Sequence, residues 1–116
     1  MDKVERFERM LAAGRESPLL RLTLGTEYLK REDPGTAIGH LARAVDLDPD
    51  YSAAWQHLGR AFEQAERTEE AASAWRSGID AADRRGDAQA AKVMRVWLRR
   101  LERRSAAAES PPAEGS

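Results

Sequence analysis

The sequence predicts an all-α fold built from repeated pairs of helices, and two observations point to it. Apolar residues recur at steps of three and four along most of the chain, the spacing of one face of an α-helix. The pattern returns after 34 residues, which indicates a helical repeat. The 116 residues, 41% apolar and 34% charged, suffice for one core but not for two, so a two-domain enzyme is excluded.

The repeat is visible when residues 18–51 are written above residues 52–85. Aligned positions share size and character: Leu24-Gly25 with Leu58-Gly59, Tyr28 with Phe62, Ala37 with Ala71, Leu41 with Trp75, and Val45 with Ile79. A glycine lies in the apolar face of the first helix of each unit, although glycine inside a helix costs about 1 kcal/mol relative to alanine. We therefore expect a second helix to approach closely there, with Ala37 and Ala71 as the counterparts.

Start and stop signals bound these helices. Ser17-Pro18 and Asp33-Pro34 each combine a capping side chain with a proline suited to the first helical turn. Leu47-Asp48-Pro49 ends the second helix of the first unit.

Two further helices flank the repeats. At residues 2–13, an apolar stripe has the spacing seen in the second helix of each repeat unit; it consists of Val4, Phe7, Met10 and Leu11. At residues 87–104, an apolar stripe matches the first helix of the second repeat when the sequence is shifted by 35 residues. It consists of Ala90, Val93, Met94, Trp97 and Leu101. Residues 105–116 have no apolar periodicity and are predicted to be a disordered tail, so the domain spans residues 1–104.

These motifs resemble the tetratricopeptide repeat (TPR). The resemblance rests on Trp55-x2-Leu58-Gly59-x2-Phe62, on Ala71-x3-Trp75, and on the matching first copy. It implies an α-α superhelix of two full repeats, 18–51 and 52–85, with a capping helix at each end. The chain departs from the pattern at Arg21, where tryptophan is usual, at Glu32 and Glu66 in the turns, where glycine is usual, and at Asp83 in place of proline.

The resemblance also implies an interaction scaffold whose first helices line a concave groove. Transferring the groove positions to this sequence selects the following residues: Leu19, Leu22, Thr26 and Leu29 on the first helix, Gln56, His57, Arg60, Glu63 and Gln64 on the second, and Ala91, Arg95, Leu98 and Arg99 on the third. One end of such a groove is apolar and the other cationic, which suits a peptide with hydrophobic residues followed by acidic ones.

One partner class of the family is disfavoured. The two-carboxylate clamp of its chaperone-binding members requires lysine, arginine and asparagine side chains. Here the corresponding positions on the first two helices hold Leu22, Thr26 and His57. We therefore expect no clamp for the acidic C-terminus of a chaperone.

Catalysis, metals and cofactors are not expected. The chain has no cysteine, and its two histidines lie on different helices without an adjacent metal-binding motif. No nucleophile elbow or glycine-rich phosphate loop occurs. We expect His40 to be solvated and His57 to face the groove. Trp55 and Trp75 fall on core positions, whereas Trp97 is the tryptophan that an exposed role would suit.

The distribution of charge leaves an alternative open. The net charge of −1 disfavours nucleic acid as a partner, but residues 83–104 carry eight basic and three acidic side chains. The last helix is thus either a solvated cap or a surface for an acidic partner. Self-association through Val96, Trp97 and Leu98 is the alternative function, although the polar outer sides of both end helices favour a monomer. With no membrane-spanning run and an acidic start, the expected location is the cytoplasm.

Overall fold

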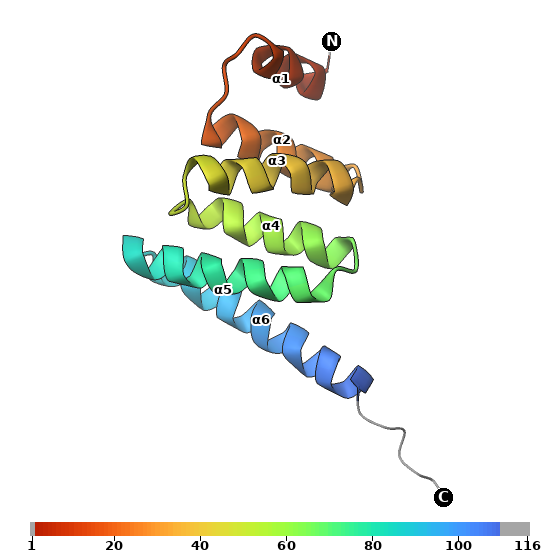
Figure 1. Cartoon of the computed structure of the whole chain (residues 1–116), viewed down its shortest axis with the longest axis vertical. Helices are drawn as coiled ribbons and strands as arrows, with labels where there is room; N and C mark the ends of the chain where they lie inside the picture. The colour runs from red at the N-terminus through yellow and green to blue at the C-terminus, as the bar shows by residue number, and fades with distance from the viewer. Residues whose placement is uncertain (1, 110–116) are drawn as a thin grey trace, which may run out of the picture.

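The computed structural model describes residues 2–109, which form six helices. These are α1 (Lys3–Ala12), α2 (Pro18–Lys30), α3 (Pro34–Leu47), α4 (Ser52–Gln64), α5 (Thr68–Arg85) and α6 (Ala88–Glu109). Helices that follow one another in the sequence stack along the long axis of the molecule (Figure 1). The predicted all-α repeat fold is confirmed, with α2–α3 and α4–α5 as the two repeated hairpins.

Local signals start several of these helices. The Ser17 hydroxyl accepts a hydrogen bond from the Leu20 backbone N–H at 3.0 Å, and the Asp33 carboxylate accepts one from Thr36 at 3.2 Å. Both caps are followed by proline, as the sequence predicts. Asp87 caps α6 in the same way through the backbone N–H of Ala90, at 3.1 Å.

Four turns between helices share one backbone geometry. Gly14, Glu32, Glu66 and Gly86 each have positive φ, between 58° and 83°. In each turn, the N–H of the next residue returns to a carbonyl in the last turn of the preceding helix, as from Asp33 to Tyr28 and from Arg67 to Phe62. Glu32 and Glu66 therefore occupy a left-handed backbone position that costs a residue with a side chain about 1 to 2 kcal/mol. Glycine adopts this conformation without that cost, which is the physical reason why the repeat pattern has glycine at these two positions.

The close approach predicted at the two helical glycines is present. A Cβ atom at Gly25 would overlap the Leu41 side chain, and one at Gly59 would overlap the Trp75 ring. The facing residues are thus Leu41 and Trp75, and not Ala37 and Ala71 as expected, although both alanines are fully buried.

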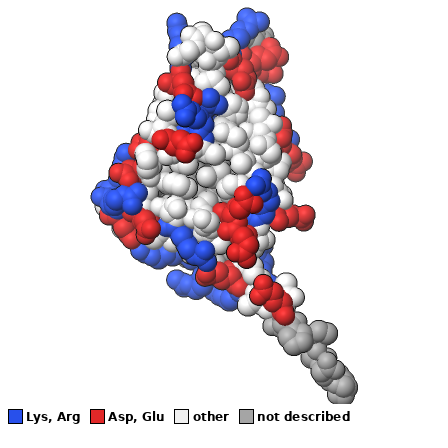
Figure 2. All heavy atoms as spheres, in the orientation of Figure 1, with Lys and Arg blue, Asp and Glu red and all other residues white. Residues whose placement is uncertain are grey.

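The first helices of the units touch one another as well as their own partners. Contacts link α2 with α4, and α4 with α6, in addition to every pair of consecutive helices. This arrangement gives α2, α4 and α6 a common face. On the face shown in Figure 2, charged side chains of both signs lie toward the margins, and uncharged residues cover the middle of the stack.

One boundary differs from the prediction. The helix α6 continues to Glu109, so residues 105–109 are helical and the tail predicted from residue 105 is wrong for them. Alanine-rich sequence has the highest intrinsic helix propensity and extends a helix that is already nucleated, with no need for an apolar stripe. The rest of the predicted tail, residues 110–116, lies outside the described residues.

Candidate functional site

A groove of about 500 Å³ lies between α2 and α4. Seven residues line it: Thr26, Leu29 and Lys30 from α2, and His57, Arg60, Glu63 and Gln64 from α4. The two helices contribute to the same groove because the 34-residue repeat presents the same side of each first helix. Six of these seven were selected from the sequence. Lys30 was missed, although it stands 34 residues before Gln64 and so occupies the same repeat position.

The remaining predicted residues of the first two helices lie elsewhere. Leu19 is 64% exposed and outside the groove lining. Leu22 is half-buried against the central core cluster. The backbone carbonyl of Gln56 accepts a hydrogen bond from Trp75 Nε1 at 3.1 Å, which ties α4 to α5.

The histidine of the groove is neutral at neutral pH. Burial lowers the pKa of His57 below its ordinary value, and the positive charge of Arg60 lowers it further. A neutral imidazole carries one donor and one acceptor nitrogen, so His57 can pair with either kind of peptide backbone group.

A second hollow, of about 290 Å³, lies between α4 and α6 and is lined by Arg60, Glu63, Trp97 and Arg100. The guanidinium carbon of Arg60 lies 5.2 Å from the centre of the Trp97 ring. The Trp75 ring contacts the same indole, with ring centres 5.6 Å apart. Trp97 is therefore half-buried between an arginine and a second tryptophan, and its ring is engaged within the molecule.

The residues predicted on α6 do not line either the groove between α2 and α4 or the hollow between α4 and α6. Arg95 pairs with Asp83 of α5 at 2.9 Å, Leu98 packs against the C-terminal core cluster, and Ala91 is fully buried in that cluster. Arg99 is exposed and lines neither hollow. Their place on α6 is taken by Trp97 and Arg100.

This difference has a geometric cause. The helices α2 and α4 begin at residues 18 and 52, which are 34 apart, whereas α4 and α6 begin at 52 and 88, which are 36 apart. Because α5 is longer and the turn at Gly86 and Asp87 is short, α6 begins with a different rotation about its own axis relative to α4. Since each residue turns a helix by about 100°, positions counted at an offset of 35 fall on another side.

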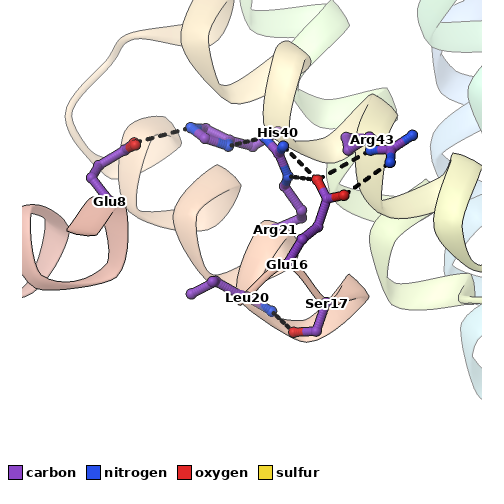
Figure 3. A network of polar contacts seen from close by, with 7 residues as sticks. All are labelled: Glu8, Glu16, Ser17, Leu20, Arg21, His40 and Arg43. Carbon is purple, nitrogen blue, oxygen red and sulfur yellow. Dashed lines mark hydrogen bonds and ion pairs between the residues drawn. The ribbon is translucent and has the colours of Figure 1, made fainter. Parts of the chain in front are cut away.

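A polar network fastens the N-terminal helix to the first repeat (Figure 3). His40 is 8% exposed, so the expectation that it is solvated is wrong. Its Nε2 lies 3.2 Å from the Glu8 carboxylate of α1, and its Nδ1 lies 3.1 Å from Arg21 Nη1. Because arginine can only donate, Nδ1 is the acceptor and Nε2 carries the proton that it donates to Glu8.

The same network continues to the loop between α1 and α2. There Glu16 accepts hydrogen bonds from Arg21 Nε at 2.8 Å and from Arg43 Nη2 at 2.9 Å. These bonds from Arg43 and Arg21 lower the pKa of the Glu16 carboxyl to about 2. Arg21, at the position where the repeat pattern has tryptophan, is therefore a structural link between three elements.

Within residues 2–109, no group of three or more histidine and acidic side chains is placed to hold a metal ion. None of the helices formed by these residues is long and apolar enough to cross a membrane.

Stacked helical hairpins whose first helices line a common groove define the class of helical-repeat scaffolds. Within that class, the model of the Tetratricopeptide repeat family matches residues 22–83, and the chain belongs to this family. TPR domains generally mediate protein–protein interactions, and proteins of the family are generally not enzymes.

Relatives agree with this assignment. The TPR repeat-containing protein PA0015 of Pseudomonas aeruginosa is 45% identical over 100 residues, which cover 86% of this chain and 95% of the relative. The solution structure of protein BPP2914 from Bordetella parapertussis is 44% identical with a TM-score of 0.79, and the match covers 91% of this chain and 92% of that one. The crystal structure of the Sgt2 TPR domain from Aspergillus fumigatus shares the fold, with a TM-score of 0.80 at 24% identity over 97% of this chain and 74% of that one.

Proposed function

We propose that this protein is a non-catalytic interaction module that holds a peptide segment of a partner in the groove between α2 and α4. The observation that supports this most directly is the open groove of about 500 Å³ itself, with its mixed apolar and polar lining.

The lining indicates which peptide would fit. Leu29 and the methyl group of Thr26 offer apolar surface from α2, while His57 and Gln64 of α4 offer hydrogen-bonding groups for a peptide backbone. Arg60 adds a positive charge on the side nearer α6. A segment with hydrophobic residues followed by acidic ones complements this order.

Self-association through α6 has less support. Of the three side chains considered for it, Trp97 is covered by Arg60 and Trp75, and Leu98 packs against the core. Val96, which is 42% exposed, is the one that remains open. A single valine buries little area compared with a standard interface, so we propose a monomer. The cytoplasm is the compartment we propose for it.

Selection of peptides from a displayed random library tests the proposal. A bulky substitution in the groove, Thr26→Trp, is expected to abolish binding of the selected peptides. Thr36→Trp, at an exposed threonine on α3, is the matched control and should bind as the wild type does. Circular dichroism checks that both variants are folded.

Two outcomes would overturn the proposal. One is peptide binding that survives Thr26→Trp, with peptide-induced NMR shifts on α3 and α5 in place of α2 and α4. The other is a tight, concentration-dependent dimer in sedimentation whose formation is lost in Val96→Gln, which would support self-association.

A further inference from the structure

The hollow between α4 and α6 contains two arginines that have no acidic partner within residues 2–109. Among residues 2–109, Arg60 lies over the Trp97 ring without an ion pair, and Arg100 likewise forms no ion pair. Many other arginines of the chain are paired, including Arg21, Arg43, Arg84, Arg85 and Arg95. The two arginines of this hollow therefore keep their donors free.

The hollow has an excess of positive charge. Its one acidic residue, Glu63, forms an ion pair with Arg104. The charge of Glu63 is thus balanced by a third arginine and leaves Arg60 and Arg100 uncompensated. The same charge of Arg60 acts on the neighbouring groove, where it helps to lower the pKa of His57.

Arg60 is also held in place before any ligand arrives. An arginine over an indole is attracted by the face of the ring, and its N–H groups remain available to a ligand. The indole of Trp97 is itself supported by Trp75, which is buried and whose Nε1 donates to the Gln56 carbonyl at 3.1 Å. Trp97 thus acts as a positioning residue for Arg60, because its ring is occupied and is not a free platform for a ligand.

The other end of the molecule shows what a pair of arginines from two helices can bind. There Arg21 of α2 and Arg43 of α3 converge on the carboxylate of Glu16 (Figure 3). Between α4 and α6, two arginines from different helices line one hollow without such a carboxylate.

We propose that Arg60 and Arg100 form a carboxylate-binding site for an aspartate or glutamate side chain of the bound peptide. The inference rests on the proposed function, and it adds a direction. The acidic part of the peptide lies between α4 and α6, and its apolar part lies in the groove between α2 and α4. Charge-assisted, two-pronged hydrogen bonds from guanidinium to carboxylate would provide the recognition.

Glutarate, a small dicarboxylate, is the probe for this site. It is titrated into the ¹⁵N-labelled full chain at constant ionic strength, with sodium chloride as the reference, while the side-chain N–H signals of Arg60, Arg100 and Trp97 are followed. We expect saturable shifts of these signals. Arg60→Gln and Arg100→Gln should each weaken glutarate binding about tenfold, the usual effect of losing a hydrogen bond between charged groups.

Two variants separate a specific site from general attraction. Arg60→Lys keeps the charge but loses the planar fork, and it should weaken binding by less than Arg60→Gln. Arg103→Gln removes an exposed charge of α6 outside the hollow and should leave binding unchanged.

Three results would overturn the inference: shifts that stay linear in glutarate, an equal loss in Arg103→Gln, or inorganic phosphate that binds at the same site more tightly than glutarate. None of them would affect the proposed function, because that is tested separately by Thr26→Trp with selected peptides. Conversely, glutarate could bind saturably while the Thr26→Trp variant still binds the selected peptides. That result would support the carboxylate-binding site and overturn the proposal that the peptide lies in the groove between α2 and α4.

Discussion

The two ends of this molecule treat their arginines differently. At the N-terminal end, Arg21 and Arg43 are occupied by Glu16, and His40 joins Glu8 to Arg21, so the polar groups fasten α1 and its loop to the first repeat. Between α4 and α6, Arg60 and Arg100 line a hollow without acidic partners of their own. Arginines therefore link parts of the fold at one end and remain available to a ligand at the other. The role of each arginine depends on whether an acidic side chain lies within reach of it in the folded protein.

The apolar packing of the two ends also differs. The N-terminal core cluster consists of Val4, Leu20 and Leu24, with half-buried side chains such as Phe7 around it. The C-terminal cluster contains Trp75 and Met94, both almost fully buried. Matched substitutions at the two ends can therefore test whether the C-terminal half carries more of the stability.

The largest difference is expected for the aromatic residues of the two cores. Trp75→Ala empties a fully buried site and should lower the free energy of unfolding by about 4 kcal/mol, whereas Phe7→Ala, at a half-buried site, should cost about 2 kcal/mol. Urea titration followed by circular dichroism measures both. An equal or larger loss for Phe7→Ala would reverse the proposed ranking of the two ends.

The helical glycines provide a second matched pair. An alanine at Gly59 meets the rigid, planar Trp75 ring, and one at Gly25 meets the smaller Leu41 side chain, which is also fully buried. Alanine recovers about 1 kcal/mol of helix propensity in both cases. We expect a net loss of about 2 kcal/mol for Gly59→Ala and about 1 kcal/mol for Gly25→Ala. Chemical denaturation that gives the opposite order would contradict this account.

The histidines should make stability depend on pH. Burial lowers the pKa of His40, and Arg21 adds to this, while Glu8 opposes it. Because the folded protein keeps His40 neutral, its contribution is complete above the ordinary pKa of 6.5 and is lost as the pH falls toward the lowered value. His57 shifts in the same direction.

The measurement compares the unfolding free energy at pH 7.5 and pH 5.5. The wild type should lose stability over this range, by no more than about 1.4 kcal/mol for each histidine because the range extends one pH unit below 6.5, and His40→Gln should lose less. Glu16 does not interfere, since its pKa of about 2 keeps it charged at both values. An identical pH effect in His40→Gln would show that the network does not hold this histidine neutral.

The smallest effect is expected in the turns within the repeats, where the two halves are alike. Glu32 and Glu66 have φ of 58° and 61°, and the structure records no ion pair for either within residues 2–109. Glu32→Gly and Glu66→Gly should each raise the free energy of unfolding by about 0.5 to 1 kcal/mol, because glycine adopts positive φ without strain. Thermal melts measure both, and a loss of stability in either variant would mean that its side chain makes a contribution beyond the turn.

Much of the fold followed from local features. The helices could be placed because apolar spacing and caps such as Ser17 and Asp33 act within a few residues of the chain. The groove residues on α2 and α4 could be selected because the 34-residue repeat carries one helix face onto the next.

Only the tertiary structure decided the rest. The side of α6 that faces α4 depends on the length of α5 and the turn before it, so Arg100 was not selected and Arg95 was. The burial of His40 depends on Glu8 and Arg21, which lie 32 and 19 residues away in the sequence. The sequence by itself determined which segments are helices and how the repeats align, since these are short-range properties. Which charged side chains pair was decided by the distances between helices in the folded protein, and the spacing of residues along the sequence does not contain these distances.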